Sequence, residues 1–257
     1  MLSRTIPGAL DMPATVLRAE VAAAYRHLNQ VLASIALQPI RFWNYLPGIG
    51  DAMGDGIDRY MVFNAGRYDA LAAPGANHSL AFDRSTVTAS AVGIGGSSLF
   101  IQCLASESPG APVENPRQAP SWRYSSRYGP KPPCFSRGTV VTLAGRRVLL
   151  IGGTASVVGE QSMHPDDVPA QFDETLANIG ALVAAALRHS TDPSAAIDRV
   201  VELRAYATSE KVAEFLWSRL AVRCANARRI EITRAWVCRP DLMLEIEGLA
   251  ELDGCPV

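Results

Sequence analysis

Leu99-Phe100-Ile101-Gln102-Cys103-Leu104-Ala105 aligns without a gap with Leu244-Glu245-Ile246-Glu247-Gly248-Leu249-Ala250, and Ala91-Val92-Gly93 aligns with Trp236-Val237-Cys238 in the same register. Working outward from these stretches, the apolar periodicity predicts the same order in both halves of the chain: helix, strand, helix, strand, strand. Duplicated units of this kind usually stack or pair with each other. The sequence therefore predicts an α+β fold of two tandem units, with mixed sheets and helices packed on one face.

The predicted elements follow from hydrophobic period and from turn residues. The first half has a helix at 14–37, a strand at 40–46, a helix at 55–68 that Gly66 is expected to end, and strands at 86–92 and 98–104 around a glycine turn. The second half has a hairpin at 139–143 and 147–151, helices at 171–189 and 209–220, and strands at 198–206, 229–238 and 242–249. About thirteen residues precede the first helix, too few for the same hairpin, so the first unit is expected to be incomplete at its N-terminus.

Between the halves lies Glu114–Gly138, which contains five prolines and is therefore neither a helix nor a central strand. It contains four arginines, one lysine, two tyrosines and one tryptophan, but only one acidic residue, Glu114. Flexible linkers lack such residues. The stretch is either an ordered loop that grips an anionic small molecule or a strap with packed aromatics and solvated arginines. The predicted domains are 1–112, a connecting loop at 113–138, and 139–257.

Composition excludes several classes of protein. A net charge of -1 argues against broad nucleic-acid or membrane binding. Five cysteines without a CxxC pair, and four histidines far apart, predict neither a disulfide framework nor a metal site, and no cofactor is expected. No apolar run reaches the length of a membrane span and no signal peptide is recognisable, so a cytoplasmic protein is expected.

The last predicted strand carries two carboxylates. Alternation places Met243, Glu245 and Glu247 on one face and apolar residues on the other. A carboxylate there is either solvated or salt-bridged on an open sheet face, or held in a lined pocket. In the second case burial would raise its pKa and make it a proton donor near neutral pH.

Four stretches of the second half carry a family resemblance: Gly152-Gly153-Thr154-Ala155-Ser156, Gln171…Thr175…Asn178, Val200-Val201-Glu202-Leu203-Arg204 and Leu244-Glu245-Ile246-Glu247-Gly248-Leu249-Ala250. They resemble the small α+β, chorismate-mutase-like units of the YjgF/RidA family. Members of that family are enamine/imine deaminases or small-ligand binders, typically trimers.

Seven motifs in order extend the resemblance to nearly the whole chain: Arg41-Phe42-Trp43-Asn44-Tyr45-Leu46-Pro47-Gly48-Ile49, Phe63-Asn64-Ala65-Gly66-Arg67, Glu114-Asn115-Pro116-Arg117-Gln118, Tyr124…Tyr128-Gly129-Pro130, Phe135-Ser136-Arg137, Gly153-Thr154-Ala155-Ser156 and Cys238-Arg239-Pro240-Asp241-Leu242. Together they resemble the chorismatases, which split chorismate into pyruvate and a hydroxybenzoate or a dihydroxycyclohexadiene carboxylate.

The resemblance implies roles for particular residues. Chorismate is a dicarboxylate, and Arg137 and Arg67 match the positions expected to bind it. Tyr124 matches a tyrosine that hydrogen-bonds the substrate. Glu245 matches the acid that protonates the enolpyruvyl methylene carbon, after which an oxygen nucleophile attacks and pyruvate leaves.

Two further positions bear on the product. Chorismatases that form 3-hydroxybenzoate resemble this chain in having a glycine at the position of Gly152 and a cysteine at the position of Cys238. In that route the ring supplies the attacking hydroxyl and forms an arene oxide, and a thiol near the ring is compatible with this chemistry. The alternative for Cys238 is a small buried hydrophobe.

Family members usually have additional residues before the first helix, so an inactive, chorismate-binding relative is an alternative, as is a RidA-like deaminase. The expected partner is a small molecule, chorismate, and the resemblance leaves the oligomeric state open.

Overall fold

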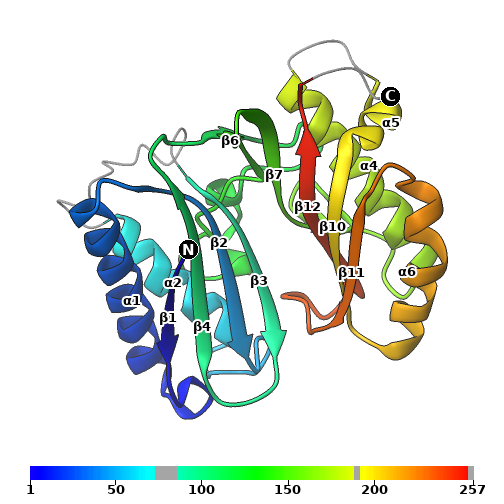
Figure 1. Cartoon of the computed structure of the whole chain (residues 1–257). Coiled ribbons are helices and arrows are strands. Elements are labelled where there is room, and N and C mark those ends of the chain that lie inside the picture. The colour runs from blue at the N-terminus through cyan, green and yellow to red at the C-terminus, as the bar shows by residue number, and fades with distance from the viewer. Residues whose placement is uncertain (73–85, 188–191, 254–257) are drawn as a thin grey trace. The chain divides into compact units, whose positions relative to one another are not determined.

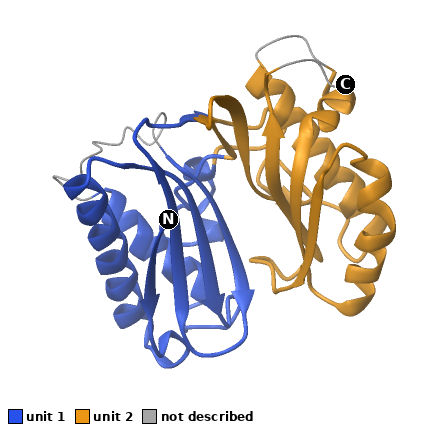
Figure 2. Cartoon of the chain, in the orientation of Figure 1, with its two compact units in different colours: residues 1–112, 121–136 blue, residues 113–120, 137–257 orange. Residues whose placement is uncertain are grey.

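The computed structural model describes residues 1–72, 86–187 and 192–253, which form two compact units (Figures 1 and 2). Unit 1 contains residues 1–112 and 121–136, and unit 2 contains residues 113–120 and 137–257. The stretch that connects the halves is thus shared: its first residues belong to unit 2 and most of the remainder belongs to unit 1.

Unit 1 is a four-stranded sheet with two helices packed together on one face (Figure 1). The strands are β1 (Leu2–Ile6), β2 (Gln38–Pro47), β3 (Thr88–Ile94) and β4 (Leu99–Ser106), in the order β1-β4-β2-β3. The helices are α1 (Ala14–Ser34) and α2 (Arg59–Leu71). Tyr25 of α1 packs its ring against Phe42 of β2 and Phe63 of α2, so all three elements share one aromatic core.

Unit 2 is built on a six-stranded sheet in the order β11-β10-β12-β7-β6-β5. Its strands are β5 (Ala111–Val113), β6 (Gly138–Leu143), β7 (Arg146–Thr154), β10 (Val200–Ala207), β11 (Arg229–Arg234) and β12 (Leu244–Glu251), with a small ribbon of β8 (Val157–Val158) and β9 (Gln161–Ser162). Its helices are α4 (Val168–Leu187), the short α5 (Pro193–Ala196) and α6 (Glu210–Arg223). Both long helices cover one face of the sheet and enclose the apolar core of the unit (Figure 1).

The strand register confirms the duplication. Tyr45 of β2 pairs with Phe100 of β4, and the corresponding Tyr206 of β10 pairs with Glu245 of β12. Each pair of strands also has a register shift at the matching place, between Pro39 and Arg41 in unit 1 and between Val200 and Glu202 in unit 2. In both units the next strand joins in parallel. The prediction of two tandem α+β units with mixed sheets is therefore confirmed.

Unit 1 has a single strand, β1, at the position where unit 2 has the hairpin of β6 and β7. β1 pairs antiparallel with β4, as β7 pairs with β12. In unit 2 the other strand of that hairpin, β6, adds to the outer edge of β7. No strand in the described part of unit 1 corresponds to β6.

The strands on either side of the Gly93–Gly96 turn are not neighbours, because β2 lies between β3 and β4. Two local predictions need correction. The strand expected at 229–238 ends at Arg234, and the following segment leads to β12. Gly66 does not end a helix but lies inside α2. A Cβ atom there would lie 2.4 Å from the carbonyl oxygen of Arg18, so glycine at this position lets α1 and α2 approach closely.

Candidate functional site

Glu245 lies in the middle of unit 2, on the face of β12 opposite the helices. Its neighbours Leu244 and Ile246 are fully buried in the core under α4 and α6, as strand alternation requires. The Glu245 side chain itself is only 6% exposed. This burial excludes a carboxylate that is solvated on an open sheet face.

The space for the Glu245 carboxyl group is provided by Gly153 on the neighbouring strand β7. A Cβ atom at Gly153 would lie 1.9 Å from Oε1 and 2.8 Å from Cδ of Glu245. Contacts that short do not occur between side chains, so any other residue at position 153 would displace the acid. Gly153 lies in a motif of the sequence but, unlike Gly152, has no predicted role, because the close contact across the sheet joins residues that are far apart in the sequence.

Arg137 and Gly152 lie directly beside this pair. The backbone N–H of Gly152 donates to the carbonyl oxygen of Arg137 over 2.8 Å. Arg137 is 6% exposed, and its Nη2 donates to the carbonyl oxygen of Ala119 over 2.9 Å. Three predicted site residues from separate motifs therefore lie near one another in unit 2: Arg137, Gly152 and Glu245. Gly152 contacts Arg137, and the adjacent Gly153 lies against Glu245.

Cys238 lies on the segment that leads from β11 to β12. Val237 and Leu242 of that segment pack against Ala155 and Val157, which follow Gly153 along the chain. Cys238 is half-buried, in contrast to the buried cysteines of the described residues, Cys103, Cys134 and Cys224. Burial raises the pKa of Cys103 and Cys134 to about 12, so those thiols stay protonated, and Cys238 is the thiol to consider for chemistry.

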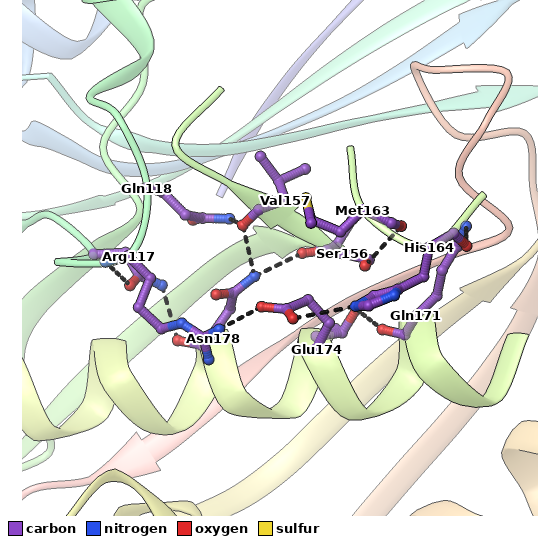
Figure 3. Close-up of polar contacts among 12 residues, drawn as sticks. Arg117, Gln118, Ser156, Val157, Met163, His164, Gln171, Glu174 and Asn178 are labelled. Atoms are coloured by element: carbon purple, nitrogen blue, oxygen red, sulfur yellow. Dashed lines mark hydrogen bonds and ion pairs between the residues drawn. The ribbon is translucent and has the colours of Figure 1, made fainter. Parts of the chain in front are cut away.

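Gln171, a fully buried residue of α4, holds the end of this segment (Figure 3). Its Nε2 donates to the carbonyl oxygens of Asp241 over 2.7 Å and of His164 over 3.1 Å. Its Oε1 accepts from the backbone N–H of Met243 over 2.8 Å, two residues before Glu245. A single side chain therefore fixes the approach to the strand that carries the acid.

A second buried residue of α4, Asn178, holds the segment after Gly153 (Figure 3). Its Nδ2 donates to the carbonyl oxygens of Ala155 over 3.0 Å and of Val157 over 2.9 Å. Gln118 donates to the same Val157 oxygen over 3.1 Å, and Asn115 donates to the carbonyl oxygen of Asn178 over 2.8 Å. The start of the connecting stretch is thus an ordered part of unit 2 rather than a flexible linker.

An ion pair adds to this attachment. Arg117 Nη2 lies 2.5 Å from Oε1 of Glu174 on α4, and the Glu174 side chain is largely buried (Figure 3). This ion pair therefore attaches Arg117 to α4 within unit 2. Gly138, which has no role by sequence reasoning, is a packing residue, because a Cβ atom there would lie 2.7 Å from Leu149 Cδ1.

Glu114 is an acid beside Arg137 that sequence reasoning does not single out. Its Oε1 accepts from the backbone N–H of Arg137 over 3.3 Å, while its buried Oε2 has no hydrogen-bond partner among the described residues. Burial raises the pKa of Glu114 to about 7, and the nearby positive charge of Arg137 opposes that shift only in part. Near neutral pH this carboxyl group is therefore partly protonated.

The raised pKa of Glu114 predicts a pH-dependent stability. A carboxyl group that binds its proton more tightly in the folded state stabilises the fold at low pH, and this contribution disappears as pH rises from about 4.5 through about 7. We expect Glu114→Gln to remove up to about 3 kcal/mol of that pH dependence. Urea unfolding of both proteins at pH 5 and pH 8 measures the difference, since all other titrating groups are shared. The same pH dependence in both would contradict the expectation.

Unit 1 contains the remaining two candidates, and Arg67 of α2 is the more unusual. It is 3% exposed, and its guanidinium carbon lies 5.4 Å from the ring centroid of Tyr25. Among the residues that the structure describes, the Arg67 side chain has no hydrogen-bond or ion-pair partner. A buried cation without a carboxylate partner is costly unless an anion joins it. This setting is compatible with the substrate-binding role that the family resemblance implies for Arg67.

Tyr124 belongs to the loop of residues 121–136, which packs over α2. The half-buried Tyr124 ring lies 5.1 Å from that of Tyr128, centroid to centroid. Ser121 joins the two ends of the loop, since its Oγ accepts from the backbone N–H of Phe135 over 3.0 Å. Arg67 and Tyr124 thus lie in unit 1, whereas Arg137, Gly152, Cys238 and Glu245 lie in unit 2.

Within residues 1–72, 86–187 and 192–253, no group of three or more His, Cys, Asp or Glu side chains is arranged to hold a metal ion. No helix of that part of the chain is both long and apolar enough to cross a membrane.

Comparison with known proteins identifies close relatives. Residues 5–105 match the family model for the N-terminal part of FkbO/Hyg5-like chorismatases. The chain is 31% identical over 239 residues to a chorismatase from Streptomyces rapamycinicus, covering 90% of this chain and 70% of that protein. It is 30% identical over 243 residues to a 3-hydroxybenzoate synthase from Streptomyces hygroscopicus, covering 88% and 68%. A chorismatase crystal structure superposes with a TM-score of 0.78 and 26% identity, covering 91% of this chain and 70% of that one.

Proposed function

This chain belongs to the chorismatase family, and from that premise we propose that it cleaves chorismate into pyruvate and 3-hydroxybenzoate, with Glu245 as the general acid. The observation that carries the proposal is the buried carboxyl group of Glu245 in the space left by Gly153. A relative about equally similar, the Streptomyces hygroscopicus protein, is named for the 3-hydroxybenzoate product.

The first step is a proton transfer to carbon. Glu245 donates its proton to the methylene carbon of the enolpyruvyl group, which becomes a methyl group and leaves an oxocarbenium-like centre. A carboxyl group removed from water holds its proton more tightly than one in solvent, and this favours a proton donor near neutral pH. Gly153 supports this role because it lets the carboxyl group occupy its position without a clash.

The second step breaks the bond between the ring and the ether oxygen. The hydroxyl oxygen of the ring attacks the adjacent ring carbon and displaces pyruvate, which takes the ether oxygen as its keto oxygen. The ring hydroxyl group loses its proton in this attack, which balances the proton used in the first step. The resulting arene oxide then isomerises to 3-hydroxybenzoate without further net gain or loss of a proton. Chorismate is thus converted without net consumption of water, whereas formation of the dihydroxycyclohexadiene carboxylate would consume one water molecule.

Substrate binding uses cations with forked geometry, because chorismate carries two carboxylates. Arg137 and Arg67 are the proposed carboxylate-binding residues, and both are nearly buried. A charge-assisted hydrogen bond from a buried guanidinium is stronger than one in solvent. Tyr124 is proposed to hydrogen-bond the substrate from the 121–136 loop.

Cys238 and Gly152 are proposed to favour the 3-hydroxybenzoate product. Cys238 is the half-buried thiol of unit 2, on a segment anchored next to the strand of Gly152. A thiol near the ring is suited to guide the opening of an arene oxide.

Incubation of the purified protein with chorismate tests this function. Chromatography with mass detection should show 3-hydroxybenzoate and pyruvate in equal amounts and no diol. Diol in place of 3-hydroxybenzoate would overturn the proposed product. Binding of chorismate without turnover would indicate an inactive relative, and ammonia release from an unstable imine without any response to chorismate would indicate a RidA-like deaminase.

A further inference from the structure

Asn64 is a buried amide without a partner. It lies inside α2 with 1% of its surface exposed, and neither its Nδ2 nor its Oδ1 makes a hydrogen bond to any residue that the structure describes. Buried amide groups are almost always hydrogen-bonded, and leaving one unsatisfied is strongly unfavourable. Both the donor and the acceptor of the Asn64 amide are therefore unsatisfied among the described residues.

Arg67 stands one helical turn further along α2, and residues three apart on a helix lie on the same side. Its guanidinium also lacks a hydrogen bond or ion pair among the described residues, and its Nε is buried. A guanidinium offers five donors and no acceptor. The two side chains together present a positive charge, several donors and one acceptor, which matches a ligand with a carboxylate and a hydroxyl group.

The duplicated helix of unit 2 gives an internal comparison. The buried stripes of the two helices correspond: Val62, Gly66 and Ala70 in α2, and Val212, Leu216 and Leu220 in α6. In this alignment Asn64 corresponds to Glu214 and Arg67 to Trp217. Glu214 is exposed and Trp217 is 72% exposed. The same helix face is thus open to solvent in unit 2 but buried and polar in unit 1.

The loop of residues 121–136 packs against this helix in unit 1. A Cβ atom at Gly129 would lie 3.2 Å from Met61 Cβ, and Lys131 Nζ lies 4.9 Å from the ring centroid of Tyr68. Burial raises the pKa of the Cys134 thiol in this loop, and Cys134 lies close enough to Arg67 for the positive charge of the guanidinium to oppose that shift in part. Asn64 and Arg67 therefore lie on a helix that is covered by the loop that carries Tyr124.

We propose that Asn64 is a further substrate-binding residue, which acts together with Arg67. Nδ2 donates to the carboxylate that Arg67 binds, and Oδ1 accepts from the hydroxyl group of the ring. This inference rests on the proposed function, because it takes chorismate as the ligand. A buried acceptor that requires a hydroxyl group discriminates strongly against an analogue that lacks it, since the acceptor is then left unpaired.

The test uses Asn64→Leu, which replaces the amide by an apolar side chain of similar size. The reference is the full-length protein with Glu245→Gln, so that chorismate binds without turnover, and calorimetry measures the affinity. We expect Asn64→Leu in this background to weaken chorismate binding about 10- to 100-fold. We also expect its melting temperature without ligand to equal or exceed that of the reference, because an unsatisfied buried amide has been removed.

Glu214→Leu, at the corresponding position of α6, is the matched control and should leave the affinity unchanged. Unchanged affinity in Asn64→Leu, while the reference binds chorismate, would overturn this inference alone and indicate that a buried water is the only partner of the amide. A lower melting temperature with unchanged affinity would assign Asn64 a structural role. Failure of the reference itself to bind chorismate would overturn the proposed function and this inference with it.

Discussion

Glu245→Gln is expected to lower kcat for chorismate cleavage by about 100- to 10,000-fold, the usual contribution of a positioned general acid. The amide keeps the size and shape of the acid in the space beside Gly153 but has no proton of suitable acidity to give to carbon. Chorismate binding should remain largely intact, since the proposed carboxylate contacts come from arginines. Steady-state kinetics and calorimetry on the same preparation measure the two quantities.

Glu251→Gln is a suitable control, because Glu251 lies on the same strand and pairs with Arg146 and Arg228 on the surface. Its kcat should match that of the unmodified protein. Unchanged turnover in Glu245→Gln would remove Glu245 from the role of general acid. Loss of binding as well as turnover would instead indicate that Glu245 holds the substrate.

Gly153→Ala is expected to have the second-largest effect, with kcat about 10- to 100-fold lower. The added methyl group would lie 1.9 Å from Oε1 of Glu245, so the carboxyl group has to move by more than an ångström. Misplacement of a reacting group on that scale can cost about 100-fold in rate. Kinetics at a temperature well below unfolding measure this effect, and Gly95→Ala, a glycine with open space around it, is the control.

A double-mutant cycle separates displacement of the acid from general damage. If Gly153→Ala acts by moving the Glu245 carboxyl group, it should lower kcat little further once Glu245→Gln is present. Additive effects of the two substitutions would show that Gly153 acts on something other than the acid.

The duplicated α+β architecture was predictable because hydrophobic period survives in both copies, even where individual residues differ. The two tandem α+β units and the hairpin of β6 and β7 follow from local pattern, and the structure confirms them. The neighbours within each sheet could not be predicted, since insertion of β2 between β3 and β4 depends on pairing between distant residues. The prediction that Gly66 ends a helix is wrong for the same reason, because glycine is required there by the close approach of the α1 backbone.

The candidate site was predictable to the extent that alternation and motif order reveal it. The period of the last strand reveals Glu245 as a carboxylate in an apolar strand, whereas the roles of Glu245, Arg137 and Gly152 are implied only by the resemblance to the chorismatases. Gly153 and Glu114 could not be assigned in advance. Gly153 matters because it lies against Glu245 across the pair of strands β7 and β12. Glu114 matters because it is buried beside Arg137.

The most direct test of the central claim is a reaction of the unmodified protein with chorismate in D₂O, with pyruvate reduced at once to lactate so that no further exchange occurs. Protonation of the methylene carbon by a solvent-exchanged Glu245 predicts one deuterium in the methyl group of each lactate, together with an equal amount of 3-hydroxybenzoate. Glu245→Gln should give neither product above the spontaneous background. Absence of pyruvate from the unmodified protein, or undeuterated lactate, would contradict the account.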